Sequence, residues 1–268
     1  MTHPIEQAAD WLRRRHEQHA GYEPLPAPLL PPTVAAAYDV QDALVRAWCA
    51  AGDAVAGHKI ALTTPQMRRF VGFDDSIAGQ VLASRVHASP ARIARDRAVR
   101  LGFECEIAFR IGRAIAPGAA PATRAAVAAH IDAIAPAFEL VDDGAADYAR
   151  FAQDGGATLR TLAADNAWNH GVVLGDWVQD WRGVDLDALE GVAAADGAEI
   201  GRGHGRDVLG HPLDAMVWMV RHLAARGRGL PAGAFVITGS LVTTRFPSAG
   251  ETDEFTLAGV GTARMQIV

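Results

Sequence analysis

The sequence predicts an α+β fold dominated by antiparallel or mixed β-sheet. Short segments rich in β-branched and aromatic residues, several of them alternating polar and apolar positions, recur along the chain. Helical patterns are scattered among them, and the regular strand-helix-strand alternation of a doubly wound parallel sheet is absent. With 268 residues, half of them hydrophobic, the chain is long enough for one large domain with a helical appendage.

The first 56 residues are predicted to form this helical appendage. It comprises, in order, an amphipathic helix over residues 3–20 capped by Thr2, a proline-rich connector over 24–32, and a second helix over 34–51 ended by Gly52. The segment either caps the domain that follows it or packs against a second subunit.

Residues 57–268 are predicted to form the main domain. Its expected strands cover residues 57–63, 77–86, 99–110, 135–141, 168–174, 234–238, 253–257 and 262–268, with a further strand pair around the Asp196–Gly197 turn. Its expected helices cover residues 65–71, 122–132 and 211–226. Thr64 and Pro65 are a typical cap and first position for the first of these helices.

The bulk composition excludes several classes of function. The chain has 25 basic and 31 acidic residues, a formal charge of −6, which argues against nucleic acid as its main partner. Its two cysteines, Cys49 and Cys105, make neither a disulfide framework nor a zinc cluster. No apolar stretch approaches the length of a membrane helix or resembles a signal peptide, so we expect a cytoplasmic protein.

Three glutamates are candidate metal ligands. Glu104 and Glu106 lie two positions apart in a predicted strand, so both side chains point to one face while Phe103, Cys105 and Ile107 point to the other. Glu139 lies in a second apolar strand. Close carboxylates repel one another, and a hard divalent cation such as Mg²⁺ or Mn²⁺, which takes oxygen ligands, removes the conflict. The alternative is a solvated strand face.

Lys59 and Asp165 are the candidate catalytic residues. Lys59 lies in an apolar strand, where burial would ease loss of its proton and where it could steer an anionic substrate. The alternative is a lysine at a strand edge that reaches water. Asp165, followed by Asn166, could orient Lys59 or the substrate, or could instead form an Asx turn before the next strand.

Thr238 and Ser240 flank Gly239 at the end of an apolar strand. The glycine would let the backbone approach a ligand, and the two hydroxyls could bind a carboxylate. The alternative is an ordinary turn at the end of the strand. Ser240 lies outside a Gly-x-Ser-x-Gly elbow, so it is not expected to be a nucleophile.

Six short motifs in order resemble the fumarylacetoacetate hydrolase superfamily, in its 2-keto-4-pentenoate hydratase and 4-oxalocrotonate decarboxylase branch. The motifs are Gly57–Thr63, Glu104–Ala108, Pro136–Glu139, Ala164–Ala167, Leu209–Leu213 and Ile237–Ser240. The resemblance implies a mixed β-sandwich roll with flanking helices, and a homo-oligomer or a complex with a related decarboxylase or hydratase. It also implies that Glu104, Glu106 and Glu139 bind the metal and that Lys59 is the active-site lysine.

The same resemblance implies a metal-dependent hydratase of aromatic catabolism. It would add water to a 2-hydroxy-2,4-dienoate to give a 4-hydroxy-2-oxo acid, with Lys59 relaying a proton or stabilising charge. A 4-oxalocrotonate-type decarboxylase, an acylpyruvate C–C hydrolase and a non-catalytic partner subunit are the alternatives.

Two positions depart from the pattern of this branch. Ile77 stands where hydratases of the group often carry an acidic residue. His58 replaces a more usual Arg or Tyr-like residue, which predicts a different substrate preference at the mouth of the site.

Overall fold

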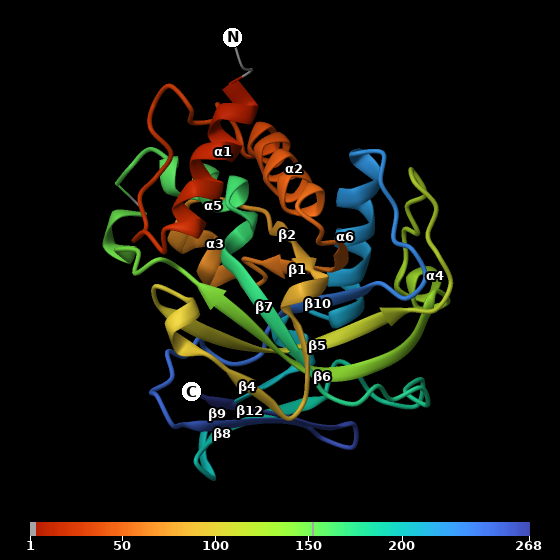
Figure 1. The fold of residues 1–268 in the computed structure, drawn as a ribbon. Helices are drawn as coiled ribbons and strands as arrows, with labels where there is room; N and C mark the ends of the chain where they lie inside the picture. Colours follow the sequence, from red (N-terminus) through yellow and green to blue (C-terminus); the bar gives the residue numbers. More distant parts are fainter. Residues whose placement is uncertain (1–3, 152) are drawn as a thin grey trace.

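The computed structural model describes residues 4–151 and 153–268, and within them twelve strands form two mixed sheets (Figure 1). The predicted α+β fold with mixed sheets is confirmed. Helices lie on one side of the larger sheet, and the smaller sheet packs on its other side (Figure 1).

The larger sheet has seven strands, and its centre consists of the two longest ones. Its order is β2 (Ile77–Leu82), β1 (Val55–Ala61), β10 (Phe235–Ser240), β5 (Leu101–Ile111), β6 (Ile131–Asp142), β7 (Asn169–Leu174) and β3 (Val86–Ala88). The β1–β10 and β3–β7 pairs are parallel, and the other pairs are antiparallel.

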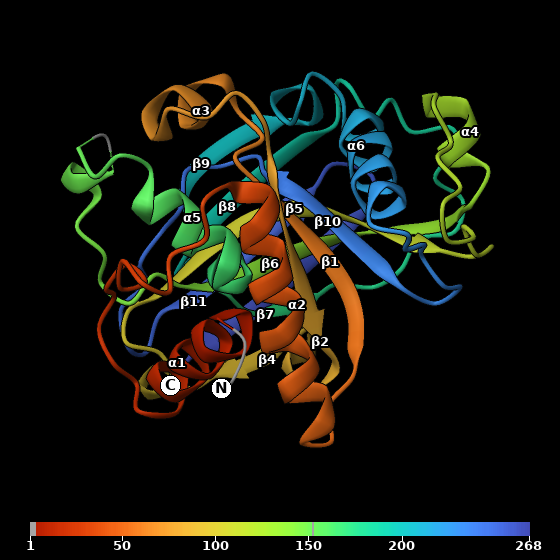
Figure 2. The same ribbon diagram turned by 90° about the horizontal axis from the view of Figure 1, so that it is seen from above.

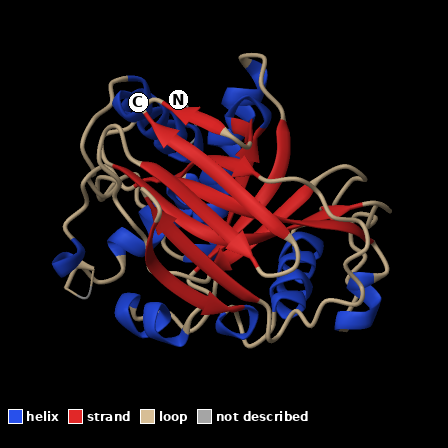
Figure 3. Cartoon of the chain, turned by 90° about the horizontal axis from the view of Figure 1, so that it is seen from below, coloured by secondary structure: helices blue, strands red, loops and turns tan. Residues whose placement is uncertain are grey.

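The smaller sheet has five strands and is built mainly from the C-terminal third of the chain. Its order is β4 (Ala91–Ile93), β12 (Gly261–Ile267), β11 (Thr252–Leu257), β8 (Glu190–Ala195) and β9 (Ala198–His204). The predicted Asp196–Gly197 turn joins β8 to β9. Strands rather than helices form this face of the molecule, as the view from below shows (Figure 3).

The main core lies between the two sheets. The ring of Phe138 on β6 packs edge-on against Phe103 of β5, with centroids 5.3 Å apart, and also contacts Phe255 of β11 at 6.3 Å. All three rings are buried. Phe103 lies on the face of β5 that is opposite to the glutamates, so the alternation in this strand places a core on one side and carboxylates on the other.

The N-terminal helices cover the other face of the larger sheet. Helices α1 (Pro4–Glu17), α2 (Val34–Ala50) and α5 (Ala157–Ala164) share one buried apolar cluster (Figure 2). The side-chain amide of Gln41 on α2 donates to the main-chain oxygens of Ala78 and Ala163. The N-terminal segment therefore caps the domain within the same chain. The predicted Thr2 cap lies outside the described residues.

The remaining helices flank the sheets. They are α3 (Pro65–Val71), α4 (Arg124–Ala128) and α6 (Pro212–Ala225). The predicted cap of α3 is confirmed, since the Thr64 hydroxyl accepts from the main-chain N–H of Met67. No helix among the described residues is long and apolar enough to cross a membrane.

Two sequence expectations about elements were wrong in extent, and two elements were missed. The helix expected over 122–132 is only α4, because Ile131 and the residues after it pair with β5 instead. The strand expected over 77–86 is broken by a single 3₁₀ turn, η1 (Ala83–Arg85), into β2 and β3. Helix α5 and strand β4 were not predicted.

Candidate metal centre

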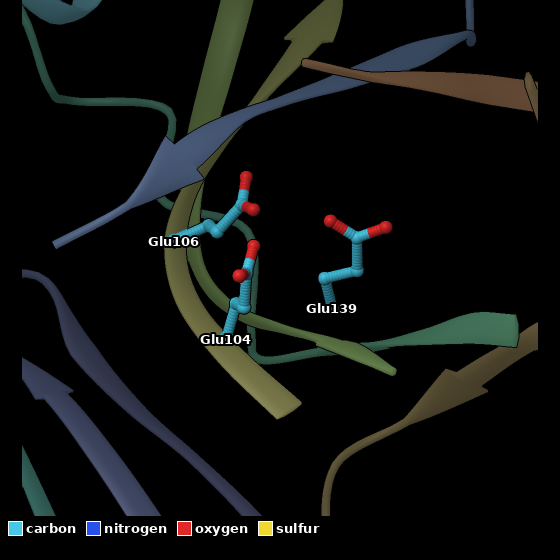
Figure 4. Close-up of side chains that lie close together, drawn as sticks. All are labelled: Glu104, Glu106 and Glu139. Atoms are coloured by element: carbon cyan, nitrogen blue, oxygen red, sulfur yellow. The ribbon is translucent and has the colours of Figure 1, made fainter. Parts of the chain in front are cut away.

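Three glutamates converge on one point in the larger sheet. Glu104 and Glu106 extend from the same face of β5, and Glu139 of β6 lies directly opposite Glu104 in the antiparallel register. One carboxylate oxygen from each lies within 4.8 Å of the other two, and Figure 4 shows the three groups pointing toward one another. The structure thus brings together the three predicted ligands from two separated segments.

Each of these carboxylates is held by the protein through one oxygen. The main-chain N–H of Gly239 donates to Oε2 of Glu106 at 2.6 Å, and the Thr244 hydroxyl donates to Glu104. Among the described residues, Oε1 of Glu106 and Oε2 of Glu139 are buried without any hydrogen-bond partner. Buried polar atoms are normally satisfied, so two buried carboxylate oxygens without partners in one cluster are acceptors that a hard cation would satisfy. The residues fit a divalent metal ion.

An irregular register in β10 places the main-chain N–H of Gly239 next to Glu106. The pairing of β10 with β5 shifts between Ile237 and Ser240, and Gly239 adopts a left-handed backbone with φ of 108°. A β-carbon on this glycine would lie 2.3 Å from the Thr63 hydroxyl oxygen, so only glycine fits. Bulges of this kind often redirect groups beside active sites.

Burial and mutual repulsion make the charged form of this cluster unfavourable. Burial, followed by the charges of Glu139 and Glu104, raises the pKa of Glu106 well above its usual range. Burial also raises the pKa of Glu139 to about 7, although the neighbouring ammonium of Lys59 acts in the opposite direction. Without a cation, therefore, the cluster retains protons near neutral pH.

Lys59 is buried beside the cluster and is the single lysine in these 268 residues, since the rest of the 25 Lys and Arg side chains are arginine. Its Nζ lies 3.1 Å from Oε1 of Glu139. Burial alone would lower the pKa of Lys59, but the three glutamates outweigh that effect and raise it. Lys59 therefore carries its proton at neutral pH. That a chain rich in arginine contains a single lysine is a further sequence feature that distinguishes Lys59.

Asn169 is a site residue that the sequence did not reveal. Its Nδ2 donates to Oε1 of Glu139 at 2.9 Å, the same oxygen that faces Lys59. Asn169 opens β7 directly after three consecutive residues with left-handed backbone, Asn166 to Trp168, whose φ values are 53°, 51° and 58°. Such a run is strained for residues other than glycine and is typical of functional sites.

Contacts of Asn166 hold this turn beside the lysine. Its side-chain amide exchanges two hydrogen bonds of 2.7 Å with the main chain of Gln80. A β-carbon at Gly79 would lie 2.7 Å from the Asn166 main-chain oxygen and 3.0 Å from Cγ of Lys59. The absence of a side chain at Gly79 therefore lets both the Asn166 turn and Lys59 pack against β2.

The structure corrects the expectation that Asp165 orients Lys59. The Asp165 carboxylate lies 2.6 Å from Nε2 of His16 on α1, and Glu139 and Asn169 surround the lysine instead. Because the backbone becomes left-handed at Asn166, the side chain of Asp165 extends to His16 while that of Asn166 extends to Gln80. Asp165 thus ties the N-terminal helix to the domain.

The expectations for Thr238, Ser240 and His58 also require correction. The Thr238 hydroxyl donates to the main-chain oxygen of Ile107, and that of Ser240 bonds to main-chain groups of Cys105 and Val242. These hydroxyls secure β10 to β5 and are not directed at a ligand.

His58 lies on the face of β1 opposite to Lys59, because successive strand residues alternate. It borders a small cavity with Asp42, His222 and Arg228. Burial, followed by the charge of Arg228, lowers the pKa of His58 to about 4. His58 is therefore not at the mouth of the metal centre.

Comparison with known sequences decides the family. Residues 46–268 match the fumarylacetoacetate (FAA) hydrolase C-terminal family. The chain belongs to the fumarylacetoacetate hydrolase family. It is 30% identical over 237 residues to a 2-hydroxyhexa-2,4-dienoate hydratase of Comamonas testosteroni, covering 87% of this chain and 86% of that protein. It is 27% identical to the TodF product hydratase of Pseudomonas putida, covering 97% and 94% respectively.

Solved structures of this fumarylacetoacetate hydrolase family share the fold. The 4-oxalocrotonate decarboxylase from Pseudomonas putida G7, complexed with magnesium and adipate, superposes with a TM-score of 0.88 at 23% identity. The coverage is 98% of this chain and 97% of that one. The same decarboxylase complexed with calcium and acetate gives a TM-score of 0.87 at 24% identity.

Proposed function

We propose that this protein is a divalent-metal-dependent hydratase of 2-hydroxy-2,4-dienoates. The proposal depends on one observation: three converging glutamates, two of which have an orphaned buried oxygen, lie beside a buried ammonium. Relatives at 27–30% identity over most of the chain are named as hydratases of such dienoates or 2-keto-4-pentenoates, which supports the assignment.

Glu104, Glu106 and Glu139 would hold Mg²⁺ or Mn²⁺. A hard cation bound there would supply Lewis-acid polarisation of the carboxylate and 2-oxygen of the substrate. A neighbour in complex with magnesium supports the choice of metal.

The reaction adds water across the diene and requires proton transfers that Lys59 can provide. The substrate gains protons at C5 and C3 and a hydroxyl group at C4, and the proton of its 2-hydroxyl is released as the 2-oxo group forms, so that one water molecule is added overall. Because Nζ of Lys59 lies 3.1 Å from Oε1 of Glu139, we assign this side chain the relay of protons and the stabilisation of negative charge near the 2-oxygen. A positioned proton-transfer group typically contributes about 10²- to 10⁴-fold in rate. Asn169 would hold Glu139 and so indirectly the lysine.

The wall beside the metal centre favours a substrate with an apolar tail. Val141 follows Glu139 by two positions and Ala61 follows Lys59 by two, so both lie on the face of the sheet that bears the site. Both belong to or pack against a buried cluster that also contains Leu62, Ile77 and Phe151. Ile77, the position at which hydratases often carry an acid, is therefore part of an apolar wall. An alkyl-substituted dienoate suits this wall better than a dicarboxylate.

Two substrates test the proposal. The purified protein with Mg²⁺ or Mn²⁺ is given 2-hydroxypenta-2,4-dienoate or 4-oxalocrotonate, and diene absorbance and CO₂ release are followed. Hydration consumes the diene without gas and is abolished by chelation. CO₂ release from the diacid would assign the decarboxylase activity instead, and inactivity toward both would favour the non-catalytic subunit.

The assembly state is proposed from the family resemblance alone. We propose a homo-oligomer, with association with a related decarboxylase or hydratase as a second form. Light scattering of the purified chain, alone and mixed with such a partner, distinguishes the two.

A further inference from the structure

A second cavity, of about 530 Å³, lies away from the metal centre. Its walls are α1 with the loop that follows it, the turn η1, and the ends of β6 and β7. Neither Lys59 nor any of the three glutamates lines it. Its volume is within the range of roughly 300–1,000 Å³ that small-molecule pockets have.

The acidic side chains that line this cavity already accept hydrogen bonds. Each has a hydrogen-bonding partner in the described structure. The pairs are Asp143 with Arg100, Asp165 with His16, Glu23 with Arg15, and Asp142 with the main-chain N–H groups of Val99, Arg100 and Gly144. Among the described residues, Asp142 is therefore the one lining carboxylate whose hydrogen bonds come from main-chain groups alone.

Two lining arginines have unused donors. One N–H of Arg85 donates to the main-chain oxygen of Asn169 at 3.2 Å, and its guanidinium stacks on Trp48 with 4.9 Å between the cation and the ring centre. A guanidinium has five N–H donors, so most of those on Arg85 are available. The guanidinium of Arg97, which also lines the cavity, has no hydrogen-bond or ion-pair partner within the described part of the chain. Arg85 and Arg97 thus outnumber Asp142, the one lining carboxylate without a side-chain partner in residues 4–151 and 153–268.

Aromatic side chains form part of the cavity wall. Trp11, Tyr22 and Trp168 line it. Burial, followed by the charge of Arg85, lowers the pKa of His170 to about 4, so this lining histidine is neutral at pH 7. A guanidinium without a carboxylate partner, in a cavity that is also lined by aromatic rings, matches an anion with a flat apolar body.

We propose that this cavity is a second ligand site for a small organic carboxylate with a flat apolar body, and that the carboxylate pairs with Arg85. The site is distinct from the metal centre but is connected to it by two hydrogen bonds. Arg85 bonds to the main-chain oxygen of Asn169, and the Asn169 side chain bonds to Glu139. A carboxylate that fixes the guanidinium also restrains Asn169, so occupancy of the cavity pre-organises Glu139 and increases the affinity of the metal centre.

Calorimetric titration of the full chain with benzoate tests the binding. The titration is performed in EDTA, so that the ligand has no metal ion to chelate. We expect saturable binding at one site per chain, no binding of the neutral analogue benzyl alcohol, and weaker binding of inorganic phosphate. Arg85→Met removes the charge and should weaken benzoate binding by about tenfold or more. Arg95→Met, an exposed arginine that does not line the cavity, is the matched control.

Several outcomes would overturn the site. These are phosphate or benzyl alcohol binding as tightly as benzoate, Arg85→Met binding benzoate as wild type does, or Arg95→Met losing as much affinity as Arg85→Met. If Arg85→Met does not fold, His87→Trp fills the cavity from a half-exposed position on β3 and leaves Arg85 intact. Undiminished benzoate binding by that variant would equally refute the assignment.

Titration with Mn²⁺, followed by electron paramagnetic resonance, tests the connection to the metal centre. Saturating benzoate should tighten Mn²⁺ binding by roughly fivefold, and Mn²⁺ should tighten benzoate binding by the same factor, because coupling is reciprocal. The effect should vanish in Arg85→Met. An Mn²⁺ affinity that benzoate leaves unchanged would refute the coupling, and neither readout depends on catalytic activity.

Discussion

Replacing Glu106 by glutamine should stabilise the metal-free protein while destroying its response to metal. Glutamine has nearly the same volume, and its amide oxygen can still accept the hydrogen bond from the Gly239 N–H. The substitution removes one of three carboxylates that are crowded together in the interior. Burial raises the pKa of Glu106 in the folded state. In the metal-free protein these carboxyl groups therefore oppose folding at any pH above their ordinary pKa values.

The separation of the carboxylates sets the magnitude. Two unit charges at 4.8 Å, the outer limit for these ligand oxygens, repel by about 3.5 kcal/mol at an effective dielectric constant of 20. Partial protonation reduces this repulsion, so we expect Glu106→Gln to raise the free energy of unfolding of metal-free protein by about 1–3 kcal/mol. Wild-type protein gains about 2.7 kcal/mol from a metal ion present at 100 times its dissociation constant, and the variant forgoes most of that gain.

Urea unfolding followed by circular dichroism, in EDTA and again in excess Mg²⁺, measures both effects. The variant should be the more stable protein in EDTA, and only wild type should gain stability in Mg²⁺. Glu254→Gln is the control, because Glu254 makes only an exposed pair with Arg264 and its loss should change stability by less than about 1 kcal/mol in both buffers. A Glu106→Gln protein that is less stable than wild type in EDTA, or that Mg²⁺ stabilises as strongly as wild type, would refute the reasoning.

Three further predictions concern the surroundings of the site. Lys59→Met should lower kcat for diene hydration by about 10²- to 10⁴-fold, and near wild-type turnover in an absorbance assay would remove the lysine from the mechanism. Gly79→Ala places a β-carbon 2.7 Å from a main-chain oxygen and should lower the free energy of unfolding by about 1–3 kcal/mol in urea, whereas Gly183→Ala, with no neighbour within 4 Å, should be nearly neutral. Asp165 raises the pKa of His16 above 6.5 despite burial, so this pair stabilises the fold below pH 6.5 and its contribution fades as the pH rises through the folded pKa. The stability difference between wild type and His16→Gln should therefore be about 1–2 kcal/mol at pH 6 and shrink toward pH 8, and a constant difference would contradict the assignment.

Local alternation made the metal ligands predictable. The period of two in β5 separates Glu104 and Glu106 from the core residues between them, and this property is written in adjacent sequence positions. The segments that form β5 and β6 are both long and apolar, so each could be recognised as a buried strand. Glu139 could therefore be added to the predicted metal ligands.

Interactions between distant segments were not predictable. Asp165 bonds to His16, which is 149 positions away, and nothing in the neighbouring sequence specifies that partner. The function of Asn169 depends on a left-handed turn of non-glycine residues, which no propensity favours and which tertiary contacts must impose. The bulge at Gly239 likewise arises from the fit of β10 between two neighbouring strands. The sequence therefore suggested the hydroxyls of Thr238 and Ser240 as site groups, and it did not reveal the Gly239 N–H that bonds to Glu106.

The position of the single lysine has a practical consequence. Reagents that acylate or reductively methylate amines usually react with many surface groups, but within these 268 residues the side chains offer them one target, and it is buried. The rate at which that nitrogen becomes labelled therefore measures how often the interior opens to solvent. A bound cation or substrate would be visible as protection, without any assay of turnover.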